Sequence, residues 1–129
     1  MSSGGRAGLP LSMRKRPLVH LELHTADMPR AFGFYAELCN WRADRVDTPC
    51  GTYWGLDTGG QVTGGIVEST AATRPLWLPY VDVPDIANAT SRAEELGASV
   101  LLTPREGPTG WRSVVSAPAG GQVALWQRK

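Results

Sequence analysis

Residues 18–40 read LVHLELHTADMPRAFGFYAELCN and contain the pattern that decides the fold. In the first part of this stretch apolar and polar residues alternate strictly, so the leucines face one way and His20, Glu22 and His24 face the other. Side chains of a β-strand alternate between its two faces, so this alternation is typical of a strand with one buried face. The stretch therefore predicts a half-buried strand whose other face carries two histidines and a glutamate.

A helix is predicted directly after this strand. Asp27 is a good N-cap, and Met28 and Pro29 suit the first helical turn. Asn40 can adopt the left-handed conformation that ends a helix. The apolar residues between them share one helical face, which we expect to be buried: Ala31, Phe32, Tyr35, Leu38 and Cys39.

The second half of the chain repeats this order. A strand-like run is followed by Asp85 as an N-cap, by a helical apolar stripe and by Gly97 as a helix stop. Three more strand-like runs then close the chain. They correspond to the runs that close the first half, around 41–46, 53–56 and 62–68.

A shift of 58 residues superimposes the two halves. It aligns residues 16–39 with residues 74–97 without a gap and gives seven identities, where chance would give about one or two. The identical residues are Arg16, Pro17, Leu18, Asp27, Ala31, Glu37 and Leu38. The chain is thus predicted to hold two βαβββ modules, at 17–70 and 74–129, that share one core. Residues 1–16 are expected to form a flexible tail.

Composition narrows the possible classes of protein. The chain has 129 residues, of which 42% are hydrophobic and 19% charged, as expected for one globular domain. A net charge of +1 provides no basic surface for nucleic acid or acidic membranes. No apolar run is long enough to span a membrane, and the start does not resemble a secretory signal. Two cysteines form no disulfide framework, so we expect a cytoplasmic protein.

The doubled βαβββ unit resembles the vicinal oxygen chelate superfamily, which includes glyoxalase I, bleomycin-resistance proteins and extradiol dioxygenases. The likeness is carried by HLELHTADMPRAFGFYAELCNW in the first half, and by WLPYVDVPD, AEELGA and APAGGQVALWQ in the second. The resemblance implies an α+β fold in which the modules form a cupped mixed sheet with the helices outside. It also implies a single glyoxalase-like domain at 17–129, a ligand bound on the concave face and a homodimer.

The resemblance further implies four positions for metal ligands, two in each module. His20 occupies the first position, but Leu78 and Ala124 occupy the two positions of the second module and cannot bind a metal. The remaining position is Glu68 if the strand GIVEST is matched, and Thr63 if the GGQV repeats are matched. Since at most two of four ligands survive, we expect no cofactor. A divalent metal at His20 and Glu68 is the alternative.

Aromatic residues are expected on the concave face. By alternation Trp126 points to the same side as Ala124, and Tyr80 to the same side as Leu78, whereas Trp77 should pack under a helix. The faces of Trp54 and Trp111 cannot be assigned from the sequence. Flat rings suit a small organic ligand, aromatic ones included. The predicted ligand-binding residues are His20, Glu22, Leu78, Tyr80, Arg112, Ala124 and Trp126.

Two functions remain open at this point, with a third as a weaker alternative. The first is a protein that binds or sequesters a small organic molecule and has a degenerate metal site. The second is a lyase, isomerase or dioxygenase of glyoxalase type, using a metal at His20 and Glu68 or using His20 and Glu22 as candidate catalytic acid–base groups. The third is a domain whose exposed tryptophans bind another protein.

Overall fold

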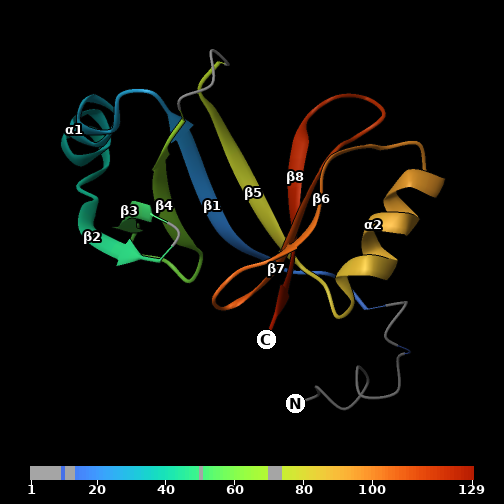
Figure 1. Cartoon of the computed structure of the whole chain (residues 1–129). Helices are drawn as coiled ribbons and strands as arrows, with labels where there is room; N and C mark the ends of the chain where they lie inside the picture. Colours follow the sequence, from blue (N-terminus) through green and yellow to red (C-terminus); the bar gives the residue numbers. More distant parts are fainter. Residues whose placement is uncertain (1–9, 11–13, 50, 70–73) are drawn as a thin grey trace, which may run out of the picture.

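A computed structural model describes residues 10, 14–49, 51–69 and 74–129, so most of the predicted tail lies outside the described residues. Within the described part, two helices and eight strands follow one another in the predicted order (Figure 1). Their bounds are β1 Leu18–Thr25, α1 Met28–Cys39, β2 Arg42–Thr48, β3 Gly51–Asp57, β4 Thr63–Glu68, β5 Leu76–Asp82, α2 Ile86–Glu95, β6 Ser99–Glu106, β7 Gly110–Ser116 and β8 Gln122–Arg128.

The strands form one continuous sheet in the order β2-β3-β4-β1-β5-β8-β7-β6. In each module the first strand pairs in parallel with the last, β1 with β4 and β5 with β8. The two modules meet where β1 pairs with β5 in antiparallel fashion, with His20 opposite Tyr80 and Glu22 opposite Leu78. The predicted pair of βαβββ modules is thus confirmed, and both modules of one sheet come from the same chain.

Both helices begin and end at the predicted residues. Asp27 accepts a hydrogen bond from the backbone N–H of Arg30 (3.1 Å), and Asp85 accepts one from Asn88 (3.0 Å). Asn40 ends α1 with a φ of 59°, in the left-handed region that asparagine tolerates. Neither helix of the described residues is long and apolar enough to cross a membrane.

Helix α1 covers one face of the first module. The Trp77 indole N–H donates to the Tyr35 hydroxyl (3.0 Å), and Phe32 packs edge-on against Trp54. Trp77 therefore lies under a helix, as predicted, and Trp54 lies on the same face. Together with Leu23 and other apolar residues they form the core on this side of the sheet.

Two residues of the predicted buried face of α1 are exposed instead. Leu38 is 67% exposed, and Cys39 is exposed as well. The buried stripe is made by Ala31, Phe32 and Tyr35, so it ends before the last helical turn. Helical periodicity identifies a face but not where the neighbouring sheet stops.

A second core lies on the face opposite the helices, which is the concave face (Figure 1). Leu78, Tyr80 and Ala124 are almost fully buried there together with Val114, and Trp126 packs against them. The register places Tyr80 beside Ala124, in agreement with the alternation read from the sequence.

Candidate functional site

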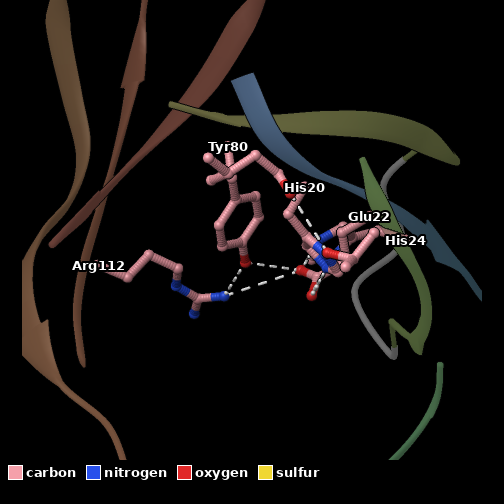
Figure 2. A network of polar contacts seen from close by, with 7 residues as sticks. His20, Glu22, His24, Tyr80 and Arg112 are labelled. Atoms are coloured by element: carbon pink, nitrogen blue, oxygen red, sulfur yellow. Dashed lines mark hydrogen bonds and ion pairs between the residues drawn. The ribbon is translucent and has the colours of Figure 1, made fainter. Parts of the chain in front are cut away.

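A cluster of five polar side chains lies on the concave face (Figure 2). Strand β1 contributes His20, Glu22 and His24 from successive positions on its concave face. Strand β5 contributes Tyr80, and β7 contributes Arg112. Residues two apart on a strand share a face, which explains why the three β1 side chains lie together. We call these five residues the polar cluster.

Glu22 is the centre of the polar cluster. Its Oε1 atom accepts hydrogen bonds from the Tyr80 hydroxyl and from Nε2 of His24, both at 2.8 Å. Nη1 of Arg112 lies 3.9 Å from the same oxygen, and Nε2 of His20 lies 3.7 Å from Oε2. The Glu22 side chain is only 12% exposed, so the four partners replace the water that a carboxylate normally binds.

These contacts keep Glu22 ionised and Tyr80 neutral. Burial alone would raise the pKa of Glu22, but contacts with His20, His24 and Tyr80 outweigh burial and hold it well below its ordinary value. Burial and the charge of Glu22 raise the pKa of Tyr80. The Tyr80 hydroxyl therefore keeps its proton, donates a hydrogen bond to Glu22 and accepts one from Nη1 of Arg112 at 2.9 Å.

His20 is held by the neighbouring strand β4. Its Nδ1 lies 2.6 Å from the Thr63 hydroxyl, which itself lies within donating distance of the Val19 carbonyl (3.3 Å). The contact with Thr63 holds the ring in place whichever of the two atoms donates the hydrogen bond. Gly65 makes room for the ring, since a Cβ there would lie 3.3 Å from Nε2 of His20.

A cavity of about 620 Å³ opens beside the polar cluster. Its wall is apolar and comes from β5, β6 and β7, whereas its polar lining includes His24, Arg74 and Arg112. The apolar wall consists of Leu76, Leu78, Leu101, Leu102 and Val114. This combination of an apolar wall with a few polar groups is typical of a site for a small organic molecule.

The structure distributes the predicted ligand-binding residues over three environments. Leu78 and Arg112 line the cavity, and His20, Glu22 and Tyr80 belong to the polar cluster. Ala124 is fully buried. Trp126 does not line the cavity, because it packs against the backbone of Gly110 and tilts toward Tyr80.

Sequence reasoning missed several residues of the cavity. His24 was recognised on the polar face of its strand, but nothing indicated that it borders a cavity. Leu101 and Leu102 come from β6, whose pairing with β7 is interrupted by two register shifts. Irregular strands break the alternation on which a sequence-based assignment of faces depends.

The alternative metal pair of His20 and Glu68 is not supported by the register of the strands. In the parallel pairing of β1 with β4, His20 lies opposite Thr63, whereas Glu68 lies opposite Thr25 at the far end of β1. The two side chains are therefore not brought together. Matching the two GGQV repeats instead placed Thr63 at this position, and Thr63 is the residue that lies opposite His20 in the pairing of β1 with β4.

The concave face does not fit a divalent metal. Among the described residues, no group of three or more His, Cys, Asp and Glu is arranged to hold one. The two second-module positions, Leu78 and Ala124, are buried in the apolar core. The Arg112 guanidinium, 3.9 Å from Glu22, already supplies a positive charge that would repel a bound cation.

The fold defines the class of this protein. Two βαβββ modules joined through β1 and β5 into one cupped sheet, with helices outside, make the vicinal oxygen chelate fold. More particularly, a family model described as Glyoxalase-like domain matches residues 14–126, so the chain belongs to the glyoxalase-like domain family. No curated protein sequence shows a significant match.

Solved structures with the same fold share little sequence with this chain. A hypothetical protein from Bacillus halodurans C-125 has a TM-score of 0.69 at 13% identity, covering 90% of this chain and 96% of that protein. Methylmalonyl-CoA epimerase from Mycobacterium tuberculosis has a TM-score of 0.63 at 14% identity, covering 87% of each chain. A glyoxalase/bleomycin resistance protein/dioxygenase superfamily member from Vibrio splendidus 12B01 has a TM-score of 0.62 at 18% identity, covering 89% of this chain and 100% of that chain.

Proposed function

We propose that this protein binds a small organic anion in the cavity of its concave face, without a metal. The observation that carries the proposal is the composition of the cavity lining. Five aliphatic side chains form the wall, and the polar lining consists of two arginines, a histidine, a serine and a glutamine. An apolar wall binds the body of an organic molecule, and the guanidinium groups bind an acidic group on it.

The charges around the cavity favour an anion over a neutral ligand. Arg112 donates to the Tyr80 hydroxyl through Nη1, and its side chain is 39% exposed, so further guanidinium N–H groups can reach a ligand. Arg74 is exposed and lines the same cavity. Glu22, the carboxylate of the polar cluster, is not part of the lining.

Family membership supports binding on this face but does not identify the ligand. The superfamily to which the chain is similar includes bleomycin-resistance proteins, which sequester a ligand without converting it. Methylmalonyl-CoA, after which the structurally similar epimerase is named, is an organic anion. For this chain, a metal-dependent lyase, isomerase or dioxygenase is the weaker proposal because His20 and Glu68 lie apart.

A fluorescent anion tests the proposal. We expect 8-anilinonaphthalene-1-sulfonate to bind saturably, and Arg112→Gln to raise its Kd about tenfold or more, since a hydrogen bond to a charged group contributes about 1.5–3 kcal/mol. Arg45→Gln is the matched control, because Arg45 is 70% exposed on β2, far along the sheet from the cavity. The measurement is a fluorescence titration of each variant.

The neutral compound N-phenyl-1-naphthylamine separates charge from apolar contact. It has the same ring system without the sulfonate, so its Kd should change little on Arg112→Gln. Arg74→Gln provides a second variant in case Arg112→Gln unfolds the protein. If both cavity variants bind the sulfonate as tightly as Arg45→Gln does, the anion site is refuted.

We further propose that the protein forms a homodimer, as the family resemblance implies. Phe34 and Leu38, four residues apart on α1, are 58% and 67% exposed, which leaves apolar surface for a second copy. Sedimentation should give about twice the chain mass of 13.9 kDa, and Leu38→Lys should shift the mass toward that of one chain. Glu37→Lys, on an exposed neighbouring position, is the control. A single-chain mass at every concentration would contradict the dimer.

A further inference from the structure

His24 has a fixed partner on one side of its ring. Its Nε2 lies 2.8 Å from Oε1 of Glu22, and the carboxylate can only accept a hydrogen bond. Nε2 must therefore carry a proton. In a neutral imidazole only one ring nitrogen carries a proton, so Nδ1 of His24 has a free lone pair.

His24 lines the cavity, and its side chain is 26% exposed. Within the described residues no hydrogen bond to Nδ1 is present, whereas Nδ1 of His20 is bound to Thr63. The two histidines thus differ: His20 is tied to a strand neighbour, and His24 can accept a proton from a molecule in the cavity.

A cation lies close to this proton acceptor. Nη1 of Arg112 and Nε2 of His24 are 3.9 Å and 2.8 Å from the same Glu22 oxygen, and both residues line the cavity. The titratable and charged groups of the polar cluster and cavity lining around His24 are Glu22 and His20 on its own strand, Tyr80 on β5, Arg112 on β7 and Arg74 before β5. A molecule that gives up a proton here leaves a negative charge beside a guanidinium.

We propose that the ligand is a weakly acidic phenol or enol that transfers its proton to His24 when it binds. The O–H bond of the ligand breaks, and the proton moves to Nδ1 of His24. The electron pair stays on the ligand oxygen, which pairs with Arg112. Glu22, hydrogen-bonded to Nε2, stabilises the resulting imidazolium as carboxylates do in carboxylate–histidine pairs. This inference rests on the proposed function and names the chemical class of its ligand.

The coloured ion of 4-nitrophenol reports the proton transfer directly. At a pH equal to the pKa of the free phenol, half of the unbound compound is neutral. Binding to the native protein should increase the ratio of ion to neutral phenol about tenfold, measured by absorbance. His24→Gln should abolish the increase because glutamine cannot accept the proton. Arg45→Gln on β2, which is already the control for anion binding, should retain it.

Glu22 acts as a positioning residue, and nitrogen NMR measures its role. The chain has two histidines, so their ring nitrogens can be assigned with His24→Gln. In the free protein at a pH where His24 is neutral, its proton should be on Nε2, and binding of 4-nitrophenol should protonate Nδ1 as well. In Glu22→Gln the preference for the Nε2 proton should weaken, because the amide can accept a hydrogen bond from Nε2 or donate one to it, whereas the carboxylate can only accept.

Each outcome decides a distinct question. If 4-nitrophenol binds but stays neutral, or if His24→Gln still ionises it, the proton transfer is refuted while the anion site stands. If 4-nitrophenol does not bind although 8-anilinonaphthalene-1-sulfonate does, the ligand class is wrong. If neither compound binds in the cavity, the proposed function itself fails. A proton on Nδ1 of His24 in the free protein also overturns the inference.

Discussion

Replacing Glu22 with alanine should lower the free energy of unfolding by about 3 kcal/mol, the lower end of the range for removing one partner of a buried ion pair. The variant leaves the buried Tyr80 hydroxyl without its acceptor and Arg112 without its nearest carboxylate. The lower end applies because the Arg112 side chain is 39% exposed and water can reach it. Urea denaturation at neutral pH measures the difference.

The pH dependence of the free energy of unfolding tests whether Glu22 is ionised in the folded protein. The pKa of Glu22 is lowered in the folded protein from the ordinary value of 4.5, so its ionised form stabilises the fold. This contribution is fully present above that value and is lost as the pH falls below it toward the folded pKa. The native protein should therefore lose stability below about pH 4.5, and Glu22→Gln should lose less over the same interval.

An exposed carboxylate provides the control. Glu94→Gln alters a solvent-facing position of α2, so its stability curve should run parallel to that of the native protein. Glu22→Gln keeps the size of the side chain, which separates loss of charge from creation of a cavity. If the Glu22→Gln and Glu94→Gln curves have the same slope in acid, the ionised Glu22 at the centre of the polar cluster is disproved.

Local patterns predicted much of the fold because they are physical requirements of single elements. The alternation in residues 18–25 correctly separated the helix-covered face of β1 from its concave face. Asp27 and Asp85 were recognisable as N-caps because their carboxylates satisfy backbone N–H groups that a helix leaves free. The internal repeat predicted the topology, since two halves with similar sequences are expected to fold into similar modules.

Features that depend on several strands could not be predicted from the sequence. The GGQV repeats and the GIVEST strand gave different partners for His20, and only the pairing of β1 with β4 decides for Thr63. The leucines of β6 reach the cavity through a strand with register shifts. That His20 and His24 both contact Glu22 depends on side-chain rotamers, which alternation does not specify.

Arg112 changes how the loss of metal ligands should be understood. The sequence shows that Leu78 and Ala124 replace two ligands, which suggests a site that has lost its charge. The structure instead shows a guanidinium bound to Tyr80 and lying near Glu22, so the concave face retains a cation. A guanidinium is always charged and binds oxyanions by hydrogen bonds, whereas a metal binds them as ligands. This exchange supports the proposed metal-free anion site.

Of the glycines in the described part of the chain, Gly110 should tolerate substitution least, and the effect of Gly110→Ala should reach the site. A Cβ at this position would collide with the Gln127 carbonyl oxygen and would lie 2.7 Å from Cζ2 of Trp126. Neither atom can yield easily, because one is backbone of β8 and the other belongs to a large, packed ring. Overpacking of this kind costs about 1–3 kcal/mol and occasionally more, and we expect about 3 kcal/mol.

The site should respond because Gly110 and Arg112 lie on the same face of β7, and Arg112 is paired with Trp126 across the strands. A shift of β7 away from Trp126 moves the guanidinium relative to Tyr80 and Glu22. Gly110→Ala should therefore also weaken binding of 8-anilinonaphthalene-1-sulfonate, measured at a temperature where the variant is folded. Gly55→Ala is the control, because a Cβ on that strand glycine would meet nothing closer than 3.7 Å. Equal denaturation midpoints for the two variants would show that the close contact between β7 and Trp126 is not a constraint on this site.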